Sequence, residues 1–238
     1  MSVTVTTRPE PQHLDFYFDV LCPFAWRTSL WMREVMRECG VSVTWKQFSL
    51  AIANNADPQS EYMRRDLTLG RTFIAAERLG GNDGVDRLYL ALGDAIHGQR
   101  LNPLDEAITP DLLVSAGHIP ELVEAALNDD TTEADLRASH AEGLGAGTFG
   151  VPTLVFDGSD RGTFGPVVDP VPTGEEAIEL WRVMRWVGTR PFMWELKKER
   201  SGRLAPLRAP GLLLDEAAAA NGATVDACEW VPSQSAAT

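Results

Sequence analysis

The chain has 238 residues, of which 44% are hydrophobic and 23% are charged. At about 150 residues per domain, this length predicts one or two domains with a sizeable core. The formal net charge is −13, and Lys and Arg form no basic stripe. This balance argues against a nucleic-acid partner and against an anionic membrane surface.

The first ten residues lack the basic start and apolar run of a secretory signal. No apolar stretch approaches the roughly 20 residues that span a bilayer. The three cysteines, Cys22, Cys39 and Cys228, are an odd number and do not suggest a disulfide-stapled scaffold. We therefore expect a cytoplasmic protein without a membrane partner.

Two strands and a helix are predicted near the N-terminus. Leu14–Val20 is aromatic and apolar, as in a short buried strand. In Trp26–Cys39 the large apolar side chains recur at helical spacing, and Gly40 then provides a stop. Val41–Leu50 alternates as a second strand does. A strand, a helix and a strand in so short a stretch predict a βαβ unit with parallel strands.

The middle of the chain, residues 58–147, has little strand signal and is predicted to be a helical insertion. The glycine-rich segment Gly80–Gly84 predicts a break within it. The helices expected on either side of this break are Tyr62–Leu79, Val85–Ile96, Pro110–Ser115, Pro120–Leu127 and Glu133–Leu144.

After the insertion the pattern returns to strands. Thr153–Phe156 is β-branched and apolar, and the chain turns back through Thr163-Phe164. Thr173-x-x-Glu176 then predicts a capping box at the start of a helix. The order βαβ, helices, ββα is the α/β pattern of a thioredoxin-like core with an inserted all-helical domain. We expect the core at 14–57 and 148–200, the insertion at 58–147 and an irregular tail at 201–238.

Cys22 is the strongest candidate for chemistry. It follows the first predicted strand, and Pro23 suits the first turn of the helix that comes next. A thiol at a helix N-terminus meets free N–H groups and the positive end of the helix dipole, which favour the thiolate and lower the thiol pKa. The alternative is a small buried apolar cysteine, which is the commoner fate of an isolated one.

The second candidate is Val151-Pro152, immediately before the strand Thr153–Phe156. A proline in this place is explained by a cis peptide bond at a tight turn. A cis bond would present the Val151 backbone beside Cys22, ready to pair with an extended thiol substrate. The alternative is an ordinary proline of an edge strand.

These two segments carry a resemblance. Phe16–Trp26, which contains Cys22-Pro23-Phe24-Ala25-Trp26, resembles the active-site segment of the DsbA-like branch of the thioredoxin superfamily, and Gly150–Thr153 resembles its cis-proline loop. Within that branch, the chain is most similar to the actinobacterial mycothiol-dependent nitroreductase family, and the likeness runs over 14–198. Further matches are Ser49–Ala51, Ala95–Gln99, Phe164–Val167 and Gly174–Ala177.

The chain departs from the redox motif Cys-x-x-Cys because its fourth position is Ala25. A disulfide within the motif is therefore excluded, although the attacking cysteine is retained. Cys39 lies about 17 residues along the predicted helix, roughly 25 Å away, and is too far to substitute. Cys228 belongs to the expected tail. A single thiol can still form a mixed disulfide that an external small thiol resolves.

The resemblance implies mycothiol as the small-molecule thiol and an electrophile such as a nitroaromatic compound as the acceptor. It also implies that Asn55, Tyr62 and His97 face Cys22 across a cleft, where His97 would stabilise the thiolate or pass a proton. A structural histidine is the alternative. Phe24 would shield the sulfur and offer an apolar face to a substrate. The resemblance further suggests a homodimer.

Two other functions stay open at this point. One is a kappa-class-like thiol transferase or a related isomerase, which would use the same helix start. The other is a non-catalytic binder of a thiol or a peptide. No cysteine and histidine spacing predicts a metal site, and no motif predicts a flavin or nicotinamide cofactor.

Overall fold

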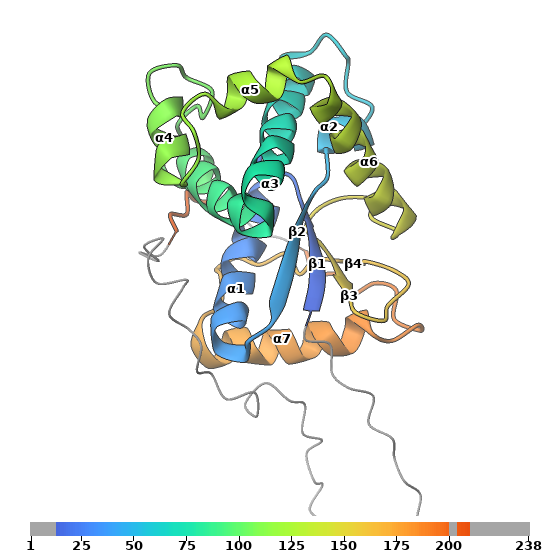
Figure 1. Cartoon of the computed structure of the whole chain (residues 1–238). Coiled ribbons are helices and arrows are strands. Elements are labelled where there is room, and N and C mark those ends of the chain that lie inside the picture. The colour runs from blue at the N-terminus through green and yellow to red at the C-terminus, as the bar shows by residue number, and fades with distance from the viewer. Residues whose placement is uncertain (1–12, 200–203, 210–238) are drawn as a thin grey trace, which may run out of the picture.

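The computed structural model describes residues 13–199 and 204–209 of the chain. A four-stranded sheet in the order β2-β1-β3-β4 forms its centre (Figure 1). β1 pairs with β2 in parallel, whereas β1–β3 and β3–β4 are antiparallel. The strands are β1 (His13–Phe18), β2 (Ser42–Gln47), β3 (Thr153–Phe156) and β4 (Thr163–Phe164).

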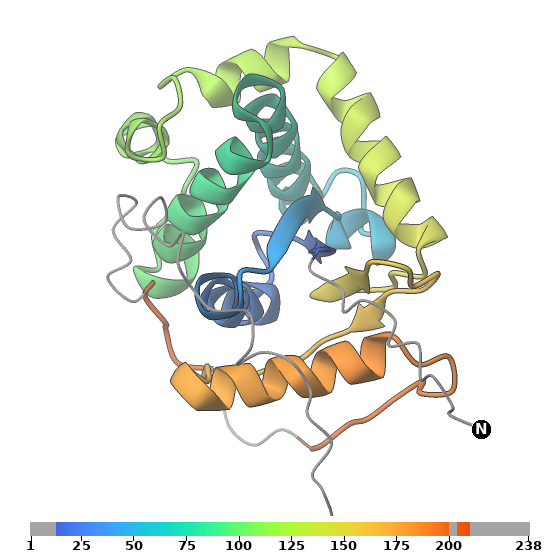
Figure 2. The same cartoon turned by 60° about the horizontal axis from the view of Figure 1, so that its bottom comes forward.

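The first and last helices cover the sheet together. α1 (Pro23–Cys39) crosses between β1 and β2, as the βαβ prediction requires, and α7 (Gly174–Gly188) follows β4. Figure 2 shows α7 running beneath α1 and the sheet. The Trp31 indole N–H donates to the Ala177 carbonyl at 3.0 Å, and the Trp31 and Trp181 rings lie 6.5 Å apart. These contacts fix α1 against α7.

The predicted capping box of α7 is wrong. Thr173 is the N-cap residue, but its side chain makes no capping hydrogen bond. The Gly174 N–H instead donates to Glu34 Oε1 at 3.0 Å. A carboxylate from the neighbouring α1 therefore takes the role that the local motif would have had.

The helices between β2 and β3 form the upper layer of Figure 1. α3 consists of two helices that meet at a kink at Gly81, whose φ of 59° and ψ of −157° are not helical. The predicted break at Gly80–Gly84 is therefore confirmed, and it centres on a glycine, for which a positive φ costs little. These elements are α2 (Leu50–Ala53), α3 (Glu61–Gly93), the π-helical turn η1 (Asp94–Gly98), α4 (Thr109–Ser115), α5 (Leu122–Asn128) and α6 (Thr131–Gly145).

An aromatic cluster joins the helical layer to the sheet. The Phe18 ring of β1 stacks on Tyr89 at 4.0 Å and meets Phe73 edge-on at 5.1 Å, both from α3. Trp45 of β2 packs on Phe16 and Tyr89. Such pairs contribute beyond the area they bury. The sheet and α3 therefore share one core, so their relative position is set by packing.

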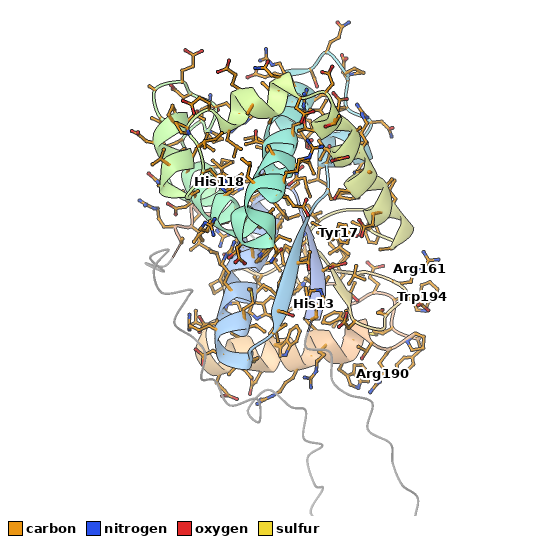
Figure 3. All side chains as sticks on the ribbon, viewed as in Figure 1. His13, Tyr17, His118, Arg161, Arg190 and Trp194 are labelled. Carbon is orange, nitrogen blue, oxygen red and sulfur yellow. The ribbon has the colours of Figure 1, made fainter. Side chains whose placement is uncertain are left out.

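Polar side chains join β1 and β2 at the end of the sheet that lies away from the helical layer. His13, which is labelled in Figure 3, begins β1. Its ring nitrogens contact the hydroxyls of Ser42 and Thr44 on β2. No helix within 13–199 or 204–209 is both long and apolar enough to cross a membrane.

The described part of the tail, 204–209, lies outside helices and strands. Cys228 lies outside the described residues.

Candidate active site

Cys22 occupies the N-cap of α1, with φ −83° and ψ 113°. Its sulfur accepts the Ala25 N–H at 3.5 Å, and its thiol donates to the Val151 carbonyl oxygen at 3.6 Å. Pro23 is the first residue of the helix. Because proline has no backbone N–H, it leaves no donor without a partner at this position. The sulfur therefore lies between the start of α1 and the Val151 loop. Only 6% of the Cys22 surface is exposed.

The Val151–Pro152 peptide bond is cis. The Pro152 carbonyl accepts the Gly165 N–H at 2.9 Å, which ties this turn to the end of β4. Val151 and Pro152 are buried, and the Val151 carbonyl points at the Cys22 sulfur. The two segments that the sequence singled out, 129 residues apart, thus meet at one atom pair.

Burial raises the pKa of the Cys22 thiol above its ordinary value. The N–H groups of Ala25 and Phe24 lower this pKa, and the nearby Asp19 charge raises it further. The expected net lowering of the pKa by the helix N-terminus is therefore wrong, because desolvation of the thiolate outweighs the helix donors. The resting sulfur is a neutral thiol at neutral pH.

Asp19 is a site residue that the sequence analysis missed. It is 1% exposed and lies three residues before Cys22. Its Oδ1 accepts the Leu21 N–H at 2.8 Å and its Oδ2 accepts the Leu50 N–H at 3.0 Å. The carboxyl group therefore joins the turn that carries Cys22 to the start of α2. An acidic residue between Phe18 and Val20 in a buried strand end was the available signal.

Asp66 of α3 is the partner of Asp19 and is 2% exposed. It accepts the Ser49 hydroxyl at 2.5 Å and the Ala51 N–H at 3.2 Å. The pKa of Asp19 is raised well above its ordinary value by burial first, then by the Asp66 charge and a hydrogen bond to Asp66. Two buried carboxyl groups in contact do not both ionise readily, which is why the Asp66 charge raises the pKa of Asp19. No sequence signal marked Asp66.

Tyr62 lies in the first turn of α3 and is 41% exposed. Burial raises its pKa to about 12, and the charges of Asp19, Asp66 and Cys22 act in the same direction. The structure thus brings Tyr62 within electrostatic reach of the thiol. The Tyr62 side chain is hydrogen-bonded to that of Asn54. Asn55, which was predicted to face Cys22, is exposed and has a φ of 51°.

His97 belongs to η1 and contacts the turn that carries Cys22. Its Nε2 lies 2.7 Å from the Val20 carbonyl oxygen, and its ring stacks on Trp26 with centroids 6.2 Å apart. Burial lowers its pKa, so the ring is neutral and Nε2–H is the donor. None of these described contacts is with the sulfur. The structural role of this histidine is the one that the geometry supports.

The remaining motif residues frame the sulfur. Ala25 is fully buried at the place of a second cysteine, Trp26 is also buried, and Phe24 packs on the core at the edge of the site. Close in sequence to the Val151–Pro152 turn, the exposed ring of Phe149 stacks on the exposed ring of Phe164 at 5.3 Å. Within the described ranges, no group of three or more metal-ligating side chains gathers.

Known proteins resemble this chain in sequence and in fold. Residues 21–198 match the family model described as mycothiol-dependent nitroreductase Rv2466c. An uncharacterized protein of Mycobacterium tuberculosis, Rv2286c, is 37% identical over 191 residues, covering 79% of this chain and 82% of its own.

Two solved structures share the fold. The probable DsbA oxidoreductase SCO1869 from Streptomyces coelicolor aligns with a TM-score of 0.53 at 20% identity, over 84% of this chain and 99% of its own. The cytosolic disulfide reductase DsbM from Pseudomonas aeruginosa aligns with a TM-score of 0.51 at 15% identity, over 73% and 99%. The DsbA-like thioredoxin fold that the sequence predicted is thereby confirmed.

Proposed function

The chain belongs to the Rv2466c-like family of mycothiol-dependent nitroreductases, and on that premise we propose that it reduces an electrophile with mycothiol through the single thiol of Cys22. The observation that carries the proposal is the place of the sulfur. It caps α1 through the Ala25 N–H and faces the Val151 carbonyl, while Ala25 leaves no resolving cysteine in the motif.

The chemistry balances with two external thiols. In the first step, Cys22 and one mycothiol each give up a thiol proton, and their sulfurs join in a mixed disulfide. The two electrons released reduce a nitro group to a nitroso group, and the two protons leave with its oxygen as water. In the second step, another mycothiol thiolate attacks the mixed disulfide, which releases mycothiol disulfide and restores the Cys22 thiol.

The surrounding residues have defined tasks in this scheme. The N–H groups of Ala25 and Phe24 stabilise the Cys22 thiolate whenever it forms, both during attack and as the leaving group. The Val151 backbone would pair with the extended small thiol. Tyr62, whose raised pKa keeps its hydroxyl protonated, is a hydrogen-bond donor within electrostatic reach of the sulfur. Among the described residues, Asn55 makes no side-chain contact that supports a role here.

A transferase or isomerase activity is the second candidate, and it is favoured by one observation. The buried Ala25 removes the intramolecular disulfide step that a dithiol oxidoreductase uses. A transferase or isomerase needs only a polar group at the helix start, so replacement of Cys22 by Ser would retain its activity. A reductase that passes through a mixed disulfide would lose it.

The test compares the natural chain with Cys22→Ala and Cys22→Ser variants. Each is incubated with mycothiol and a nitroaromatic acceptor, and consumption of both is followed. The proposal expects two thiols consumed for each acceptor reduced to its nitroso product, and no turnover above background in either variant. Turnover retained by Cys22→Ser would favour the second candidate. No turnover by the natural chain, with the thiol bound, would leave a binding protein.

A further inference from the structure

Residues Leu204–Ala209, here called the C-terminal strap, dock beside the active site although they form no helix or strand. The family match ends at residue 198, so the strap lies beyond it. Figure 1 draws the strap as the short red-orange trace that follows the grey gap. Leu207 and Ala209 pack against the hydrophobic core. The strap is therefore part of the folded protein, although a tail without packed structure was expected.

Leu207 bridges two residues that bound the active-site turn. Its carbonyl oxygen accepts the Trp26 indole N–H at 2.9 Å, and its N–H donates to the His97 carbonyl at 3.2 Å. Trp26 and His97 are the pair whose rings stack. One strap residue thus holds both members of this pair by its backbone alone.

The ends of the strap are anchored as well. The Ala209 N–H donates to Asp94 Oδ1 at 2.7 Å, and Arg208 forms an ion pair with the same carboxylate at 3.1 Å. Towards its start, the Ala205 carbonyl accepts from the Arg27 guanidinium at 2.5 Å. A methyl group added to Gly98 would lie 2.7 Å from Asp94 Oδ1 and 2.9 Å from the Arg208 Cα, so it would press on both the strap and the carboxylate that anchors it.

These contacts lead to the nucleophile. His97 donates from Nε2 to the Val20 carbonyl at 2.7 Å, two residues before Cys22. On the other side, the Trp26 backbone N–H donates to the Cys22 carbonyl at 3.0 Å. The strap therefore braces the residues that contact the Cys22 turn at both of its ends.

We propose that the C-terminal strap is a positioning element for Cys22. By holding Trp26 and His97 together, it keeps the sulfur buried between the Ala25 N–H and the Val151 carbonyl. When the strap is released, the turn opens more often, the sulfur gains solvent, and the thiol pKa falls towards its ordinary value because less desolvation opposes the thiolate. The inference rests on the proposed function only in taking Cys22 as the reactive group.

The test uses the full chain with two releasing variants and two matched controls. Gly98→Ala places a methyl group against the strap, and Asp94→Ala removes the acceptor of the Ala209 N–H. Gly145→Ala is the same change as Gly98→Ala, at a helical glycine with nothing within 4 Å. Asp94→Asn keeps one acceptor oxygen and loses an ion pair whose Arg208 side is 66% exposed and therefore weak.

The readout is carbamidomethylation of Cys22 by iodoacetamide, measured at the peptide level as a function of pH. In Gly98→Ala and Asp94→Ala we expect a rate about fivefold higher at pH 7.5, the factor that loss of one hydrogen bond implies for local opening, and a lower pH midpoint. Asp94→Asn and Gly145→Ala should stay within about twofold of the natural chain.

An unchanged rate and midpoint in both Gly98→Ala and Asp94→Ala would overturn the proposal, even if their unfolding temperatures fall, because the strap would then contribute only stability. Equal effects in Asp94→Ala and Asp94→Asn would also contradict it, since the acceptor oxygen would not matter. The assay contains no mycothiol. A failure of the proposed reductase activity and a failure of this inference are therefore seen in different experiments.

Discussion

The thiol of Cys22 faces the carbonyl oxygen of Val151 at 3.6 Å, across the cis peptide bond that precedes Pro152. The N-cap of α1 and the Val151–Pro152 loop, which are distant in the sequence, meet at this sulfur. The arrangement presents one nucleophile and one backbone acceptor to a small thiol, and Ala25 supplies no second sulfur. A single, buried thiol with these neighbours has consequences for reactivity, for redox chemistry and for stability, and each can be measured.

The reactivity of Cys22 should rise with pH over an unusually high range. Because burial raises the thiol pKa, the midpoint of its alkylation is expected above the ordinary cysteine value of about 8.5. The rate at pH 7 should be correspondingly low and should increase through the raised pKa as the thiolate forms. Peptide-level alkylation between pH 6 and 10.5 measures it, and a midpoint at or below 7 would contradict the burial argument.

Replacing Ala25 by Cys should restore a dithiol motif. The new sulfur would occupy the fourth position, one helical turn after Cys22, where an internal disulfide closes and competes with the external thiol. We expect Ala25→Cys to release the mixed disulfide with mycothiol within the protein, so that the adduct seen by intact mass falls at least tenfold. An adduct of undiminished yield would show that the two sulfurs do not meet. Ala25→Ser is the matched control.

The carboxyl pair of Asp19 and Asp66 should make folding stability depend on pH. The folded-state pKa of Asp19 is raised, so the folded protein holds more protons than the unfolded chain. The stability that this group contributes is therefore greatest below the pKa of an aspartate in the unfolded chain, about 3.9. It is lost as the pH rises through the raised pKa of Asp19 in the folded protein.

Asp66→Asn isolates this contribution because it removes one charge and keeps an amide that can donate to Asp19. We expect the variant to lose part of the decline in unfolding free energy between pH 4 and 8, relative to the natural chain. Urea unfolding across that range measures the difference. Parallel pH profiles for the two proteins would show that the pair shares no proton. Asp57→Asn, at an exposed aspartate, serves as the surface control.

Removing the Phe18 ring should destabilise the sheet and α3 together. Phe18 is fully buried and contacts Phe73, Tyr89 and Trp45. Phe18→Ala is expected to lower the unfolding free energy by about 3–5 kcal/mol, the usual cost of a large cavity in an aromatic core. Chemical unfolding followed by Trp fluorescence measures it. A loss below about 1 kcal/mol would contradict the shared core, and Phe192→Ala, at an exposed ring, is the control.

The sequence was sufficient for the elements that repeat a local pattern. The strand Leu14–Val20, the helix to Cys39 and the strand Thr153–Phe156 are predicted by hydrophobic period and β-branching, and their order predicts the fold. Cys22 and Pro152 stand out because a proline at a helix start and a proline before a strand both need a structural reason. Such signals are carried by neighbouring residues, so they can be predicted without a structure.

The parts that could not be predicted depend on residues far apart in the chain. The pKa of Cys22 depends on its burial, which no local pattern states, and Asp66 gains its meaning only when α3 brings it to Asp19. The Glu34 contact that replaces the Thr173 capping box and the docking of Leu207 on Trp26 are likewise tertiary. His97 matched a family segment, but its contacts with the Val20 carbonyl and the Trp26 ring are also tertiary and carry no local signal.

Intact mass of the protein after incubation with mycothiol disulfide shows directly whether Cys22 forms a mixed disulfide with a small thiol. We expect one covalent mycothiol adduct on Cys22, which is lost on addition of reduced mycothiol and is absent in Cys22→Ala. The adduct should form faster as the pH rises towards the raised thiol pKa. The absence of an adduct on the natural chain between pH 7 and 10, or an equal adduct on Cys22→Ala, would show that Cys22 is not the reactive thiol.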